Sequence, residues 1–72
     1  MAVTKEVIRE RLATLSARER QVFDLVIAGK FSKEIADALG ITERTVKHHR
    51  GAINRKMGAR HVVELVNMAH SL

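Results

Sequence analysis

The segment from Phe31 to Lys56 constrains the fold of this 72-residue chain more than any other part. It reads Phe-Ser-Lys-Glu-Ile-Ala-Asp-Ala-Leu-Gly-Ile-Thr-Glu-Arg-Thr-Val-Lys-His-His-Arg-Gly-Ala-Ile-Asn-Arg-Lys, which predicts a short helix, a tight turn and a longer basic helix. Ala36 is small enough for the second helix to cross above it, and Gly40 can adopt the φ > 0 conformation that ends the first helix. Val46 points back into the angle between them. These positions predict a helix-turn-helix.

Basic side chains gather on the second of these helices. Residues 43–57 carry five basic side chains and one acidic one, so they hold +4 of the formal net charge of +5. At about 100° per residue, Val46, Ile53 and Met57 lie close to one line, which is the expected core face. The opposite side holds Arg44, Lys47, His48, Gly51 and Arg55. A basic face opposite a buried stripe is typical of a nucleic-acid binder, so we expect this helix to enter a DNA major groove.

Each of the first four expected helices follows a residue that can cap it. The side-chain oxygens of Ser and Thr accept hydrogen bonds from the free amides of a first helical turn. Ser16 and Glu19 form the pattern of a capping box, in which each side chain bonds the other residue's amide. The expected caps are Thr4, Ser16, Ser32 and Thr42, and the expected helices cover about residues 5–13, 17–28, 33–39, 43–57 and 61–70.

These elements predict an all-α fold, a four-helix bundle that contains the helix-turn-helix. We assign residues 14–72 to a helix-turn-helix DNA-binding domain and residues 1–13 to a linker or an N-terminal helix. A chain of this length forms one small domain with a small core. It leaves no room for an enzyme cleft and offers no pairing of a base with a nucleophile, so we do not expect an enzyme.

Composition bears on several other classes of protein. The chain has no Cys, which removes disulfides and thiol metal sites and is compatible with a reducing compartment. His48 and His49 are adjacent on a helix and diverge, so we expect no metal site and no cofactor. No apolar run approaches the roughly 20 residues of a membrane span, and the first residues lack the apolar segment of a secretory signal. We therefore expect a cytoplasmic protein without a membrane partner.

Five short motifs resemble the LuxR-type DNA-binding domain, a four-helix module of bacterial transcription regulators. They occur in the family's order and spacing: Leu15-Ser-Ala-Arg-Glu-Arg20, Gly29-Lys-Phe-Ser-Lys-Glu-Ile-Ala36, Leu39-Gly-Ile-Thr42, Thr45-Val-Lys-His-His49 and Lys56-Met-Gly58. The segment Ala59-Arg-His-Val-Val-Glu-Leu-Val-Asn-Met-Ala69 is most similar to the FixJ branch of two-component response regulators. The resemblance implies sequence-specific binding of double-stranded DNA by the effector domain of a transcription regulator. Members normally carry a receiver domain before this module, and none fits in residues 1–14, so the chain resembles either the isolated effector domain of a longer parent chain or a stand-alone regulator. The resemblance also implies RNA polymerase as a partner.

The resemblance further implies roles for particular residues. The positions of Lys47, His48 and Gly51 approach base edges in relatives. Positions near phosphates are those of Lys33, Thr42, Thr45, Arg50 and Lys56, and Arg44 and Arg55 complete the expected DNA-binding set. The helix over 61–70 resembles the element through which relatives pair on DNA, with Val62, Val63 and Val66 as the expected dimerisation residues. The chain departs from the family pattern at two places: Gly51 stands where some relatives have Lys, and Val62 where many have Arg or another polar residue.

Two alternative functions fit part of the same pattern. The promoter-reading domain of a sigma factor shares the helix-turn-helix shape, but it needs contacts to the core polymerase that the sequence does not show. A helical protein-interaction module would place the basic helix against an acidic partner. Binding of random duplex DNA in competition with an acidic peptide separates this second alternative from DNA binding.

Overall fold

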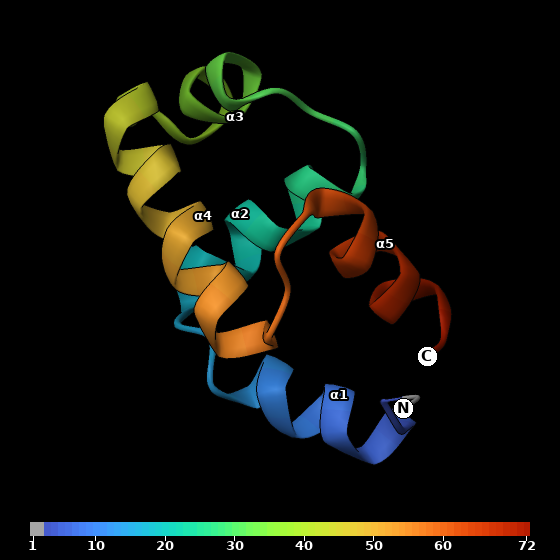
Figure 1. Ribbon diagram of the computed structural model, residues 1–72. Coiled ribbons are helices and arrows are strands. Elements are labelled where there is room, and N and C mark those ends of the chain that lie inside the picture. The colour runs from blue at the N-terminus through green and yellow to red at the C-terminus, as the bar shows by residue number, and fades with distance from the viewer. Residues whose placement is uncertain (1–2) are drawn as a thin grey trace.

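The computed structural model describes residues 3–72 and contains five α-helices and no strand in that range (Figure 1). The helices are α1 Lys5–Ala13, α2 Ala17–Ile27, α3 Ser32–Leu39, α4 Glu43–Met57 and α5 Val62–His70. The predicted all-α fold is confirmed, and α3 and α4 form the helix-turn-helix. Of the two alternatives for residues 1–13, the structure has a helix, although residues 1–2 lie outside the described range. None of these helices has the length and hydrophobicity needed to cross a membrane.

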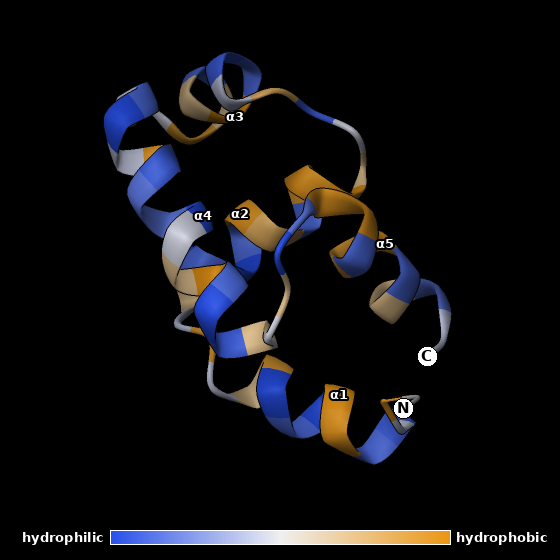
Figure 2. Cartoon of the chain, in the orientation of Figure 1, coloured by the Kyte–Doolittle hydropathy of each residue, from blue (hydrophilic) through white to orange (hydrophobic). Residues whose placement is uncertain are grey.

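The helix α4 lies at the centre of the packing. It contacts α1, α2 and α3, whereas α5 packs on α2 (Figure 1). In Figure 2 the ribbon of α4 is mostly hydrophilic, while hydrophobic residues concentrate on α2 and on the start of α5. The largest fully buried side chains are Ile8, Val22, Phe23, Ile35, Val46, Ile53 and Met57. Three of these form the predicted core stripe of α4, and Ile8 brings α1 into the same core.

The turn between α3 and α4 has the predicted geometry. Gly40 ends α3 with φ 67° and ψ 35°, in the left-handed region that favours glycine. Its N–H donates to the carbonyl of Ala36, and the N–H of Ile41 donates to the same carbonyl at 3.0 Å. Ala36 is buried and Val46 has no exposed surface. The three residues that predicted the motif therefore occupy the positions expected of them.

Three of the four predicted caps are confirmed. The hydroxyls of Thr4, Ser16 and Thr42 accept hydrogen bonds from the amides of Val7, Glu19 and Thr45. The capping box of α2 is complete, because Glu19 Oε1 accepts from the Ser16 N–H at 2.9 Å. The helix α2 ends at Ile27 and α5 begins at Val62, each one residue inside the predicted bound. Local sequence rules thus locate most helix ends to within one residue.

The prediction that Ser32 caps α3 is wrong. The helix begins at Ser32 itself, and Phe31 occupies the N-cap with extended backbone, φ −80° and ψ 160°. The Phe31 N–H donates to Glu34 Oε1 at 2.8 Å, but Phe31 returns no side-chain oxygen to the first turn. The Ser32 hydroxyl instead accepts a hydrogen bond from Arg50 Nη1 at 3.1 Å. The hydroxyl that the local rule assigned to capping therefore bonds Arg50, a residue of α4 that is distant in the sequence.

A largely buried carboxylate ties α2 to the C-terminal end of α4. Lys56 Nζ lies 2.7 Å from Glu19 Oε1, the oxygen that also accepts from the Ser16 amide. The hydrogen bond from Lys56 is the main cause that holds the pKa of Glu19 below its ordinary value, and the Ser16 amide adds to it. Burial acts in the opposite direction but is outweighed. The carboxylate therefore stays ionised and joins two helices.

The same end of α4 receives a cation from α1. Arg11 Nη1 donates to the Met57 carbonyl at 2.8 Å, where a positive charge complements the helix macrodipole. Gly58 follows with φ 66°, and a Cβ at this position would lie 2.9 Å from Arg11 Nη1. The backbone conformation thus favours glycine here, and a side chain would in addition displace the Arg11 guanidinium.

Val46→Asp should abolish or nearly abolish folding. An unpaired buried charge costs about 3–5 kcal/mol, which is comparable to the total stability of a domain this small. Val63→Asp is the matched control, because Val63 is 57% exposed and its replacement leaves the new charge in water. Thermal unfolding followed by circular dichroism measures both variants. A melting temperature unchanged by Val46→Asp would contradict the orientation of α4.

The ion pair of Glu19 should make stability depend on pH. A pKa that folding lowers contributes stability at neutral pH, and this contribution disappears as pH falls below the ordinary value of 4.5 and through the lower pKa of the folded state. We expect Glu19→Gln to lower the free energy of unfolding by about 1–3 kcal/mol at pH 7, and by progressively less in acid.

Urea unfolding of the parent and variant across this pH range measures the effect. Asp24→Asn is the control, because Asp24 pairs with Arg20 on the surface and such pairs contribute little. A difference between parent and Glu19→Gln that stays constant down to strongly acidic pH would show that the ionised carboxylate is not its source.

Candidate nucleic-acid interface

The outward side of α4 is the candidate interface. Arg44, Lys47, His48 and Arg55 are exposed there, and Gly51 is half-buried. Within residues 3–72 the basic side chains of this group form no salt bridge. The buried stripe of α4 faces the other helices, so the predicted separation into a core face and a basic face is confirmed. Because the cations lack protein partners in the described range, their charge is directed into solvent.

One flank of this face adjoins α3. Arg50 and Asn54 lie three and seven residues after Lys47, so the three residues follow one another along a single stripe of the helix. Arg50 lies in the middle and donates to Ser32 at the start of α3. This bond places the N-terminal end of α3, with its exposed Lys33, beside the stripe. Because Ser32 is neutral, Arg50 keeps its full positive charge while its position is fixed.

The opposite flank adjoins α2 and holds the remaining predicted phosphate contacts. Thr42 Oγ1 accepts from the Thr45 amide at 3.1 Å and donates to the Thr45 hydroxyl at 2.9 Å, so both hydroxyls are already engaged. Lys56 is paired with Glu19, although its side chain is 38% exposed. His49 is half-buried, and its ring lies edge to face with that of His48 at 6.0 Å between centroids. Charge on this flank is therefore partly compensated within the protein.

Two contacts of the interface were not predicted from the sequence. Ser32 and Arg50 are 18 residues apart, and Glu19 and Lys56 are 37 apart. Local rules had already given Ser32 and Glu19 a capping role, and no local signal pointed to a second partner. Asn54 was not among the predicted DNA-binding residues either, although its spacing from Lys47 and Arg50 places it on the same stripe of α4.

The expected dimerisation residues lie on α5 and differ in exposure. Val62 and Val63 are 45% and 57% exposed, and Val66 is half-buried. Leu65 is the buried residue of this helix. By contrast, the apolar residues Ile8 and Leu12 of α1, which also require cover, are buried in the core. Apolar surface is therefore left on α5 rather than on α1.

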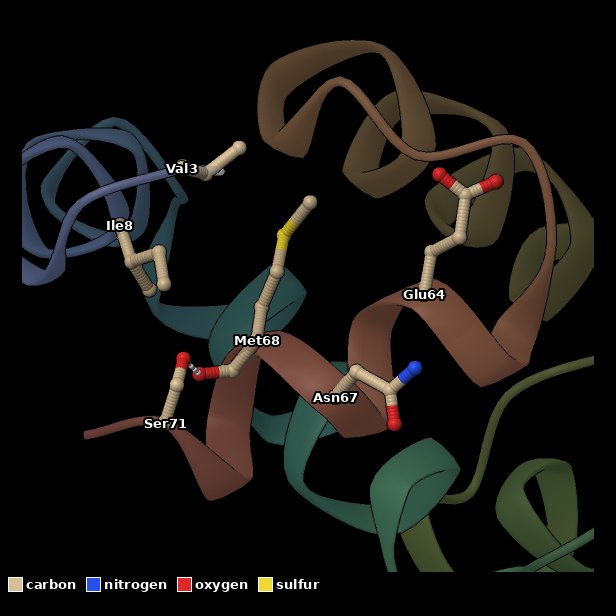
Figure 3. A pocket seen from close by; sticks show the side chains of 6 residues that line it. All are labelled: Val3, Ile8, Glu64, Asn67, Met68 and Ser71. Atoms are coloured by element: carbon tan, nitrogen blue, oxygen red, sulfur yellow. Dashed lines mark hydrogen bonds between the residues drawn. The ribbon is translucent and has the colours of Figure 1, made fainter. Parts of the chain in front are cut away.

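A cavity of about 240 Å³ lies between the start of α1 and α5 (Figure 3). Its lining consists of Val3, Ile8, Glu64, Asn67, Met68 and Ser71. The Ser71 hydroxyl donates to the Met68 carbonyl at 2.8 Å. The cavity lies beside Val3 and Ser71, near the two ends of the described range, and its lining contains none of the predicted DNA-binding residues.

Comparisons with known proteins agree with this geometry. The family model of bacterial regulatory proteins, luxR family, matches residues 13–69. The transcriptional regulatory protein FixJ of Rhizobium meliloti (strain 1021) is 52% identical over 62 residues, which cover 86% of this chain and 30% of that protein. The transcriptional regulatory protein TdiR of Thauera aromatica is 50% identical over 56 residues, or 78% of this chain and 25% of TdiR.

A solved structure has the same fold. The low-resolution structure of the response regulator StyR superposes with a TM-score of 0.89 at 37% identity, covering 93% of this chain and 34% of that one. The chain thus spans about a quarter to a third of the length of these relatives.

The family match contains the whole helix-turn-helix, including every predicted DNA-contacting position on α3 and α4. It confirms the predicted resemblance and the predicted class, that of transcription regulation rather than enzyme catalysis. The chain belongs to the luxR family of bacterial regulatory proteins, as a helix-turn-helix domain of the kind found in response-regulator transcription regulators.

Proposed function

We propose that residues 14–72 bind double-stranded DNA in a sequence-specific manner, as the effector domain of a transcription regulator of the response-regulator type. The helix α4 enters the major groove with its outward side toward the bases. The observation that carries the proposal is this outward side itself. It presents exposed cations that form no salt bridge within residues 3–72, directly opposite a fully buried stripe.

Residues at the centre of the face read the bases. Lys47 and His48 donate to base edges, and a Lys ammonium can reach guanine O6 or N7. Gly51 allows the helix backbone to approach the groove closely, since it has no side chain. The surrounding phosphates are contacted by Lys33, Thr42, Arg44, Thr45, Arg50, Arg55 and Lys56. Lys56 reaches a phosphate without leaving Glu19, because an ammonium has three donors and 38% of this side chain is exposed.

The domain acts within a larger assembly. The relatives are three to four times longer than the segment that they share with this chain, and several are named as response regulators. We propose that a receiver domain accompanies this domain in a longer parent chain. In this arrangement the DNA-bound domain acts on RNA polymerase in the bacterial cytoplasm, where the chromosome lies.

Two copies of the domain pair on DNA through α5. One helix-turn-helix covers one half-site, and pairing doubles the length of DNA that is read. Val62 and Val63 are exposed and Val66 is half-buried, so this helix leaves apolar surface that the domain's own core does not cover. The patch is small, and so small an interface rarely holds a dimer without DNA. We therefore propose a monomer in dilute solution.

Fluorescence anisotropy with a selected duplex and with random duplexes tests DNA binding and base readout together. For the parent we expect log K to fall linearly with log salt, with a slope of about −0.9 per phosphate neutralised. Lys47→Ala should cost about 1–3 kcal/mol on the selected duplex and flatten the preference at one base pair. Arg50→Ala is the control, because a lost phosphate contact weakens binding to all duplexes alike.

Two results would contradict this assignment. A salt slope near zero would exclude DNA binding and favour the protein-interaction alternative, in which the basic helix binds an acidic peptide instead. If Lys47→Ala weakens binding to every duplex equally, Lys47 contacts phosphate rather than a base. The sigma-factor alternative additionally requires direct binding to core polymerase.

Sedimentation with a duplex that carries two half-sites tests the pairing. The parent should bind as two copies per duplex and sediment as a monomer without DNA. Val63→Glu should reduce this to one copy while the variant stays folded, because a charge would be buried at the interface. Leu72→Glu is the matched control, since Leu72 is exposed and apolar but lies beyond α5. Two bound copies of Val63→Glu would place the interface elsewhere.

A further inference from the structure

Phe31 is the most exposed large hydrophobic side chain of residues 3–72, at 76%. It is also the N-cap of α3, a position where Ser, Thr, Asp or Asn would bond the free amides of the first turn. The ring therefore has two local disadvantages, since it exposes apolar surface to water and leaves α3 without a side-chain cap. In an otherwise consistent sequence, residues that break local rules tend to mark functional positions.

The surroundings of Phe31 are basic. Lys30 and Lys33 flank it in the chain and are exposed. Its neighbour Ser32 holds Arg50, which shares a stripe of α4 with Lys47. One acidic residue also lies here: Glu34 accepts from the Phe31 N–H and keeps its negative charge, but the three cations Lys30, Lys33 and Arg50 outnumber it. In Figure 1 the start of α3 and the first turns of α4 lie at the end of the molecule opposite to α1 and the C-terminus.

We propose that Phe31 is a DNA contact, whose ring packs against the deoxyribose between two phosphates that Lys33 and Arg50 neutralise. The inference rests on the proposed function and adds to it an apolar contact with the backbone. The sugars are the least polar part of a DNA backbone, and adjacent phosphates supply the charge that this basic surface requires.

Charge complementarity favours DNA over an apolar protein surface as the occupant. An apolar partner that covered Phe31 would also remove water from the neighbouring lysines and from Arg50 without supplying a counter-charge. A DNA backbone covers the ring and pairs the cations in the same step. The exposure of the Phe31 ring to water in the free domain is then removed in the complex.

The test measures DNA affinity over a salt series for the intact chain and three variants, with the selected duplex as the probe. Phe31→Ser should lower affinity by about tenfold, the factor expected from burying roughly half of a phenyl side chain. The salt slope should stay unchanged, because an apolar contact releases no counterions. Lys33→Ala should instead reduce the slope by about 0.9. Leu72→Ser, which removes exposed apolar surface at the other end of the molecule, should bind like the parent.

Thermal unfolding separates this role from a structural one. Phe31→Ser supplies the missing cap oxygen, so its melting temperature should rise by roughly 4–8 °C while its affinity falls. Phe31→Leu has no such oxygen and should keep affinity within about threefold of the parent. Opposite changes in stability and affinity are not expected if the ring only supports the fold.

Two results would overturn the inference, and they are distinguishable from each other. If the parent binds the duplex and Phe31→Ser binds it equally well, Phe31 does not contact DNA and the proposed function still stands. If the parent shows no salt-dependent binding to any duplex, the proposed function itself fails, and the role of Phe31 fails with it.

Discussion

Burial of Val46, Ile53 and Met57 sets the rotation of α4 about its own axis, and the candidate interface depends on that rotation. Successive residues of a helix are separated by about 100°, so fixing one stripe fixes the direction of every other side chain. These three side chains are at most 1% exposed, enclosed by the helices that pack on α4. Arg44, Lys47 and Arg55 therefore face outward although no salt bridge within residues 3–72 holds them there.

Polar contacts at the flanks adjust this arrangement. The hydrogen bond between Arg50 and Ser32 joins α4 to α3, and that between Lys56 and Glu19 joins α4 to α2. The Arg11 guanidinium of α1 donates to the carbonyl of Met57, the last residue of α4. The C-terminal end of α4 is thus tied at two points, and part of its charge is compensated. Arg44, in contrast, stands in the first turn of α4, at the positive end of the helix dipole, without a salt-bridge partner among residues 3–72. This unfavourable placement matches that of Phe31 on the neighbouring helix.

Local physics explains what could be predicted from the sequence. Gly40 requires a left-handed conformation, the hydroxyls of Ser16 and Thr42 require nearby amides, and the spacing of the buried residues identifies the core face of α4. Each of these signals lies within a few residues, so the helices and the turn could be predicted from the sequence. The outward-facing residues of α4 could be predicted as well, because helical periodicity alone assigns them to a face. Their separate roles on DNA depend on the ligand and remain proposals.

What the sequence left open depends on distant partners. The apolar stripe of α1 is thin, and only the core of the folded chain shows that Ile8 and Leu12 are covered. Ser32 was misassigned because its hydroxyl had a local use, while Arg50 comes from another helix. The exposure of Phe31 could not be predicted either, because the exposed fraction of a side chain depends on how the whole chain folds. In each of these cases the burial or the hydrogen-bond partner of a residue depends on how the helices pack, which local sequence does not contain.

The uneven distribution of charge has a consequence for kinetics. Residues 43–57 hold +4 of the net +5, and the rest of the chain is close to neutral. In the field of a polyanionic duplex, such a body experiences a torque as well as an attraction. Under the proposed function, the domain turns its α4 side toward the duplex before they touch, and fewer collisions occur in unproductive orientations. Orientation during approach raises the association rate, and dissolved salt weakens this effect over the Debye length of about 8 Å at physiological ionic strength.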